Sequence, residues 1–132
     1  MRAPGNHLLW LTRAAAIVAI VFGAATIRAG GNVLFGDGAA TSGNVVGFVL
    51  WFNFLAGFAY IAAGIGLWPR FRWSVWLALA LVLGTLMIFA ALGIHVLTGG
   101  AFEMRTVWAM TLRSVVWVLI AFIAYRSIGF LG

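Results

Sequence analysis

The chain has 132 residues, of which 65% are hydrophobic and only 8% are charged. A soluble domain carries about a quarter charged residues, and a disordered chain would lack the seven Trp and eleven Phe present here, so both classes are excluded. The absence of cysteine excludes disulfides, thiolate metal ligands and cysteine nucleophiles. The net charge of +6 comes from arginines scattered at the ends of apolar segments, which indicates anchoring in a membrane and no binding of nucleic acid.

Four apolar segments are long enough to cross a bilayer, which requires about 20 helical residues. In chain order they cover residues 8–27, 45–68, 73–97 and 106–125. Residues 29–44 are rich in Gly and Asn and predict a flexible loop, whereas Pro69 predicts a tight turn between the second and third segments. The sequence therefore predicts an all-α fold, a single-domain integral membrane bundle of four antiparallel helices.

The first segment has an alternative interpretation. Arg2 and Arg13 precede an apolar stretch at 14–25, which is also the pattern of a signal peptide. Because no small-residue cleavage site is followed by a polar start of a mature chain, we interpret the segment as the first spanning helix.

The arginines near the segment ends predict an orientation, because basic residues are retained on the cytoplasmic side. One end of the expected bundle carries five arginines, and the other end carries two arginines together with both acids. The first set is Arg2, Arg13, Arg70, Arg72 and Arg126, and the second is Arg28, Arg105, Asp37 and Glu103. We therefore expect both termini in the cytoplasm and the two glycine-rich loops outside.

Arg113 lies inside the fourth segment, roughly 10 Å below its outer end at about 1.5 Å per residue. A charge at the bilayer centre costs about 2.5–3.5 kcal/mol to insert, so its guanidinium should face protein, water or a ligand. Asn53 lies at nearly the same depth in the second segment, but one amide oxygen cannot satisfy all the guanidinium donors. In one interpretation Arg113 has a structural role, in which it reaches outward to the headgroups or bonds helix carbonyls, and Asn53 hydrogen-bonds between helices. In the other, the two residues bind a ligand or a lipid headgroup.

Further polar side chains lie near the outer ends of the segments. In one interpretation Arg28, His95, Glu103 and Arg105 line a vestibule above Arg113, where the histidine serves as a proton donor or a ligand. In the other, the histidine is an interfacial anchor and the charges at the helix start form a surface pair. The predicted ligand-binding residues are Arg113, Asn53, His95, Glu103 and Arg105, and no catalytic residue is predicted.

The two histidines do not form a haem site within one chain. His7 and His95 lie at opposite membrane faces, roughly 30 Å apart, which is too far for two axial ligands of one iron. Because the chain also has only two acids and no cysteine as possible ligands, we expect no tightly bound metal or other cofactor.

Small residues recur along one face of the second segment. They are Ala56, Ala59, Ala63 and Gly66, with Gly57 and Gly64 beside them. Small residues let helices approach closely in lipid, so this face predicts packing within the chain, or alternatively the seam of a homodimer.

Three features of the sequence occur together: FGAATIRAG at 22–30, the glycines from Gly57 to Gly66 that lead to Arg70, and His95 at the end of the third segment. In these features the chain resembles the DoxX-like group of small bacterial membrane proteins. The resemblance implies four helices in the bacterial inner membrane and a respiratory, quinone-linked or oxidative-stress setting, often beside other subunits. Where that group often carries a carboxylate, this chain has Asn53, so an acid-dependent redox or proton role is not implied.

We therefore expect a non-enzymatic accessory subunit of a redox or transport assembly. The alternative is a binder or carrier of a small amphipathic or anionic molecule, such as a quinone, in an outward-facing pocket anchored by Arg113. The expected partners are the lipid bilayer and a larger membrane complex or a second copy of the chain. An enzyme has the least support, because no Ser–His–Asp set or pair of intramembrane carboxylates is present.

Overall fold

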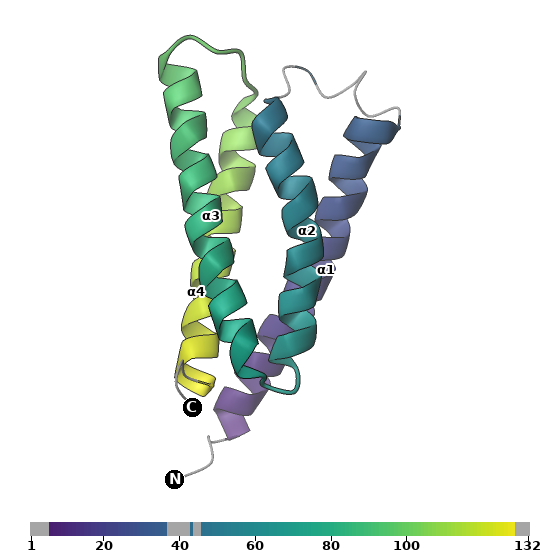
Figure 1. The fold of residues 1–132 in the computed structure, drawn as a ribbon, viewed down its shortest axis with the longest axis vertical. Helices are drawn as coiled ribbons and strands as arrows, with labels where there is room; N and C mark the ends of the chain where they lie inside the picture. Colours follow the sequence, from purple (N-terminus) through teal and green to yellow (C-terminus); the bar gives the residue numbers. More distant parts are fainter. Residues whose placement is uncertain (1–5, 37–42, 44–45, 129–132) are drawn as a thin grey trace.

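The computed structural model describes residues 6–36, 43 and 46–128, which form four long helices (Figure 1). They are α1 (Asn6–Phe35), α2 (Gly47–Leu67), α3 (Arg72–Leu97) and α4 (Met104–Ser127). Each of the four is long and apolar enough to cross a membrane. The all-α class and the presence of four helices of membrane-spanning length are therefore confirmed.

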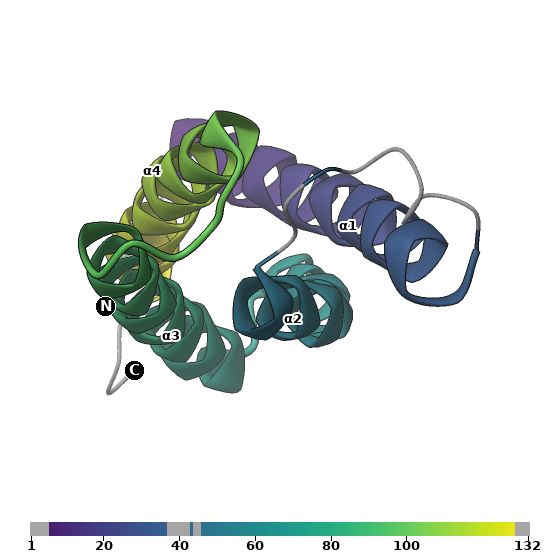
Figure 2. The same ribbon diagram turned by 90° about the horizontal axis from the view of Figure 1, so that it is seen from above.

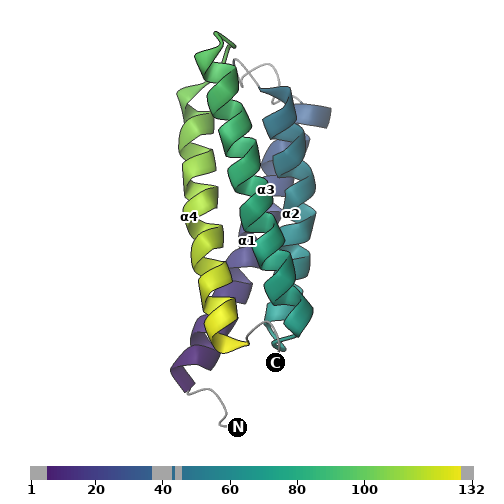
Figure 3. The same cartoon turned by 60° about the vertical axis from the view of Figure 1, so that its left-hand side comes forward.

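The helices form a bundle in which α1 contacts α2 and α4, and α3 contacts the same two helices. We call the end that holds the last residues of α1 and α3 the upper end, and the end with the α2–α3 turn the lower end (Figure 1). The first residues of α2 and α4 also lie at the upper end, whereas α1 begins and α4 finishes at the lower end (Figures 1 and 3).

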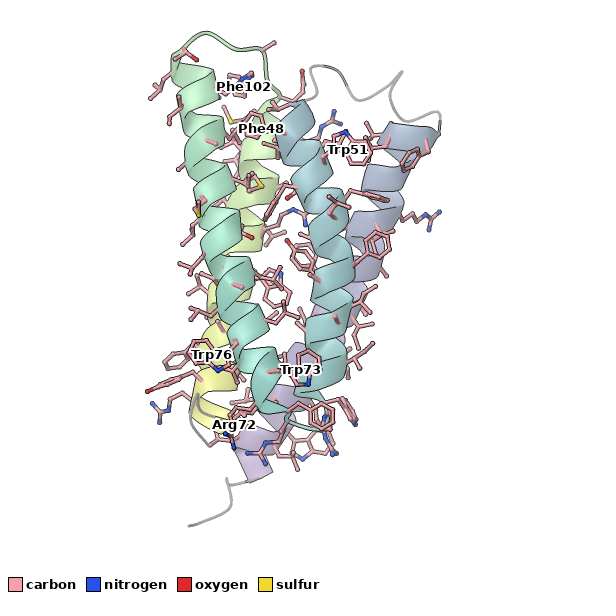
Figure 4. All side chains as sticks on the ribbon, viewed as in Figure 1. Phe48, Trp51, Arg72, Trp73, Trp76 and Phe102 are labelled. Atoms are coloured by element: carbon pink, nitrogen blue, oxygen red, sulfur yellow. The ribbon has the colours of Figure 1, made fainter. Side chains whose placement is uncertain are left out.

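The outer surface of the bundle is apolar, as a lipid-facing surface requires. Six of the seven tryptophans are at least 42% exposed, and only Trp117 is fully buried. Trp73 and Trp76 lie beside Arg72 near the lower end, and Trp51 lies near the upper end (Figure 4). These positions at the two ends suit the amphipathic indole rings, which prefer the boundary between hydrocarbon and headgroups.

Glycines bring α1 and α2 into backbone contact. A Cβ atom on Gly23 would lie 2.6 Å from the carbonyl oxygen of Gly57, and one on Gly64 would lie 2.7 Å from the carbonyl oxygen of Ala16. Gly66 packs equally closely against α3, because a Cβ there would lie 2.6 Å from the ring of Trp73. Ala56, Ala63 and Gly66 are buried within the chain, so this face of α2 is used for internal packing and not for the alternative homodimer seam. A second copy of the chain as a partner stays a prediction.

The first helix is longer than the sequence predicts. We expected a loop from residue 29, but residues 29–35 continue α1. Gly30 lies against Phe54 of α2, where a Cβ would be 3.2 Å from the Phe54 Cβ, and the ring of Phe35 meets Phe54 edge-on at 5.8 Å. This packing outweighs the low helix propensity of glycine.

The other three helices begin and end within two residues of the predicted limits. Some predictions concern residues outside the described part of the chain, namely Arg2, Asp37, the side chain of His7 and most of the expected loop up to residue 44.

The backbone contact between α1 and α2 predicts the effect of two matched substitutions. Gly23→Ala should lower the free energy of unfolding by about 2 kcal/mol, because the new methyl group would press on the Gly57 carbonyl and separate the helices. Gly93→Ala on α3 should be neutral or stabilising by about 0.5–1 kcal/mol, because nothing lies within 4 Å of a Cβ there and alanine is the better helix former. Unfolding of the purified protein in detergent measures both, and equal effects would contradict the assigned contact.

Candidate ligand-binding site

A cavity of about 300 Å³ lies between α1, α2 and α4 in the upper half of the bundle. It forms because α1 lies close to α4 near the lower end and leans away from it toward the upper end (Figures 1 and 2). The lining is mostly apolar, with polar groups from all three helices. The lining residues are Thr26, Ala29, Gly30, Val33, Val46, Val49, Leu50, Asn53, Arg105, Thr106, Ala109 and Arg113.

The side chain of Arg113 points into the bundle. Its Nη1 donates a hydrogen bond of 2.9 Å to Thr26 Oγ1 on α1 and one of 3.4 Å to the Tyr60 hydroxyl on α2. The guanidinium carbon also lies 5.1 Å from the centre of the Phe22 ring and 5.9 Å from that of Tyr60. Cation–π attraction of this kind contributes about 0.5–2 kcal/mol and grows when water is excluded.

The charge of Arg113 has no counter-ion on the helices. None of the four helices contains an acidic residue, and both hydrogen-bond partners, Thr26 and Tyr60, are neutral hydroxyls. In addition, Arg113 Nε is buried without a hydrogen-bond partner. The arrangement leaves positive charge and a donor at the inner side of an apolar cavity, which is the chemistry that attracts an anion.

Asn53 adds an acceptor to the same cavity. Its Nδ2 donates a weak bond of 3.6 Å to the sulfur of the buried Met110, and its Oδ1 is buried without a partner. An unpaired buried amide oxygen costs about 1–3 kcal/mol. As the sequence predicts, Asn53 and Arg113 line one cavity, but the structure shows no hydrogen bond from one to the other among the described contacts.

Arg105 lines the cavity near its upper opening. It precedes Arg113 by eight residues on α4, which places the two backbones roughly 12 Å apart along the helix axis. The α4 wall therefore carries one cation near the surface and one at depth.

The remaining predicted residues lie elsewhere. His95 Nε2 is 2.9 Å from the Ala101 carbonyl oxygen, and its ring meets Phe48 edge-on, so it fixes the α3–α4 connection. Glu103 precedes α4, and a Cβ on Gly43 would lie 2.9 Å from its Oε2. Arg28 is exposed and borders a separate depression on α1. Of the residues expected to form a vestibule, only Arg105 lines the cavity.

An aromatic layer closes the cavity toward the lower end. Phe22, Tyr60 and Trp117 each lie thirteen residues from the upper end of α1, α2 and α4 respectively. The ring of Tyr60 stacks on Phe22 at 5.6 Å and packs against Trp117 in a tilted arrangement at 4.8 Å, and both Tyr60 and Trp117 are fully buried. The layer therefore fills the space between the three helices that line the cavity.

Thr26, Tyr60 and Phe22 were not among the predicted site residues. The signal for Thr26 is its depth: it precedes Phe35 by nine residues, and Arg113 follows Met104 by nine. That match could be found only once the true end of α1 was known.

Comparisons with models of protein families, with curated proteins and with solved structures found no match to the chain. The DoxX-like resemblance therefore stays a prediction. Within the described part of the chain, no three His, Cys, Asp or Glu residues come together as a protein metal site requires.

The unpaired oxygen of Asn53 predicts that this residue lowers stability. Asn53→Leu should leave the free energy of unfolding unchanged or raise it by about 1 kcal/mol, because it removes a buried acceptor that has no donor. Thr26→Val should lower it by about 1–2 kcal/mol, because it leaves a donor of the charged Arg113 unpaired. Unfolding of both variants in detergent measures these changes. A large loss of unfolding free energy in Asn53→Leu would show that the amide is structural.

Proposed function

We propose that the protein binds a small anionic amphipathic molecule in the cavity between α1, α2 and α4. The observation that carries this proposal is the half-buried side chain of Arg113, which lines the cavity and has only neutral hydroxyls as described hydrogen-bond partners. A carboxylate or phosphate at this position would neutralise the charge and accept from the guanidinium.

The shape and lining of the cavity support an amphipathic ligand. Its volume of about 300 Å³ is at the lower limit of the range for small-molecule sites. Val33, Val49 and Leu50 provide an apolar wall for a short hydrocarbon chain, while Arg113 and Asn53 provide polar contacts for a head group. A neutral quinone would use the same wall but would leave the arginine charge uncompensated.

For the membrane we propose an antiparallel bundle with both termini and the lower end in the cytoplasm of a bacterial cell. Support comes from the arginines at the lower end, namely Arg13, Arg70, Arg72 and Arg126, and from the positive-inside rule. The cavity would then open toward the outside. A role as an accessory subunit of a redox or transport assembly stays a second proposal, supported by the DoxX-like resemblance.

The orientation can be tested by labelling with a membrane-impermeant thiol reagent, since the chain has no cysteine of its own. In intact cells Thr98→Cys should react, because this exposed residue follows α3 at the upper end. Phe71→Cys, in the α2–α3 turn, should react only after the membrane is opened. The reverse pattern would overturn the proposed orientation.

Ligand binding can be tested through thermal stability of the purified protein. Decanoate should raise the unfolding temperature by several degrees at saturation, because a ligand held at a hundred times its Kd contributes about 2.7 kcal/mol. Decanol, which has the same chain without the charge, should not. Arg113→Lys should weaken the effect because it loses the planar fork of donors, and Arg113→Leu should abolish it.

Arg28→Leu serves as the control, because it removes an exposed arginine that does not line the cavity. Stabilisation of Arg113→Leu by decanoate to the same extent as the wild type would contradict the proposal. Stabilisation by decylubiquinone alone would favour a quinone as the ligand, and stabilisation by neither compound would favour the accessory-subunit role.

A further inference from the structure

The turn between α2 and α3 holds an arginine in an unusual backbone conformation. Arg70 has a φ of 65°, and it is the only residue other than glycine with a positive φ in the described part of the chain. Hydrogen bonds from Arg70 N to the Leu67 carbonyl and from Phe71 N to the Gly66 carbonyl fix the turn. Glycine adopts this conformation without strain and is the usual residue there, so the arginine side chain is the feature to be explained.

One side of the Arg70 guanidinium is anchored to the end of α4. Its Nη2 donates a hydrogen bond of 2.6 Å to the carbonyl oxygen of Ser127. The Nε of Arg70 and the Oγ of Ser127 are both buried and have no hydrogen-bond partner. The contact thus leaves a charged donor and a hydroxyl unused side by side.

A second arginine reaches the same turn from α1. The guanidinium carbon of Arg13 lies 4.8 Å from the centre of the Trp68 ring, and Trp68 precedes Arg70 by two residues. The Nε of Arg13 is also buried without a partner. Arg13 and Arg70 thus both lie beside the α2–α3 turn, one over Trp68 and the other at the end of α4, and the Nε of each has no hydrogen-bond partner.

The surroundings of this pair are those of a membrane interface. Trp68, Phe71 and Trp73 are each at least 42% exposed, and Arg72 and Trp73 lie at the lower end near the turn (Figure 4). Exposed aromatic rings beside arginines mark the depth at which lipid headgroups lie. An anion that reaches this site from the bilayer therefore arrives with its hydrocarbon chains already beside the apolar outer surface.

We propose that Arg13 and Arg70 bind the phosphate of an anionic phospholipid at the lower end of the bundle. Guanidinium groups carry several donors that match the oxygens of a phosphate, and Arg13 and Arg70 each bring one guanidinium to the α2–α3 turn. This site lies at the opposite end of the bundle from the cavity and does not depend on the ligand proposed for it.

Native mass spectrometry of the full-length protein tests the proposal by comparing adducts of phosphatidylglycerol and phosphatidylcholine supplied in equal amounts. The wild type should retain phosphatidylglycerol preferentially. Arg13→Gln and Arg70→Gly should each lower this preference about tenfold, the effect of losing one hydrogen bond to a charged group. Arg70→Gly is the sharper variant, because glycine fits the turn and the fold should persist, as circular dichroism can verify.

Arg72→Gln is the matched control, since it removes an exposed charge from the same turn and should change the preference less than about twofold. Equal losses in Arg72→Gln and Arg70→Gly would overturn the proposal by showing that the charge acts without a defined site. Unchanged preference in Arg13→Gln and Arg70→Gly would also overturn it. Displacement of the lipid by excess inorganic phosphate would show a site for free phosphate, whereas its retention supports the lipid as occupant.

Discussion

The guanidinium of Arg113 joins three helices inside the membrane-spanning part of the bundle. It donates from α4 to Thr26 on α1 and to Tyr60 on α2, and it lies over the ring of Phe22. A charge in lipid is tolerated only when protein groups or water replace its hydration. The positions of α1 and α2 at this level are therefore tied to one side chain of α4, and the cavity lies directly above that point.

The cavity results from unequal contacts around the bundle. Glycines such as Gly23 and Gly57 draw α1 and α2 into backbone contact, and close approach of this kind is the main source of helix association in lipid. No comparable set of glycines joins α1 to α4 among the described contacts, so α1 follows α2 and leans away from α4 toward the upper end (Figure 2). The same small residues that tighten one interface thereby open the neighbouring one.

Most of the fold could be predicted from the sequence, because membrane thickness sets helix length and Pro69 marks a turn. The end of α1 could not, since Gly30 and Gly31 favour a loop locally and only their packing against Phe54 keeps them helical. Because the end of α1 was predicted too early, the equal depth of Thr26 and Arg113 could not be recognised from the sequence. Counting residues from the predicted helix ends placed Arg113 and Asn53 at nearly one depth. From the observed starts of α2 and α4, however, Asn53 lies six residues down and Arg113 nine, which is roughly 4.5 Å deeper, and Asn53 contacts Met110. The partners of each side chain also depend on the rotation of the helices about their axes, which the sequence does not show directly.

The aromatic layer of Phe22, Tyr60 and Trp117 decides whether a molecule in the cavity can pass through the bundle. Tyr60 and Trp117 are fully buried with their ring centres 4.8 Å apart, so this layer blocks a route from the cavity to the lower end of the bundle. Passage to the other side would require these rings to move together inside a close-packed interior. In this conformation the cavity is therefore a blind pocket and not a channel through the bundle.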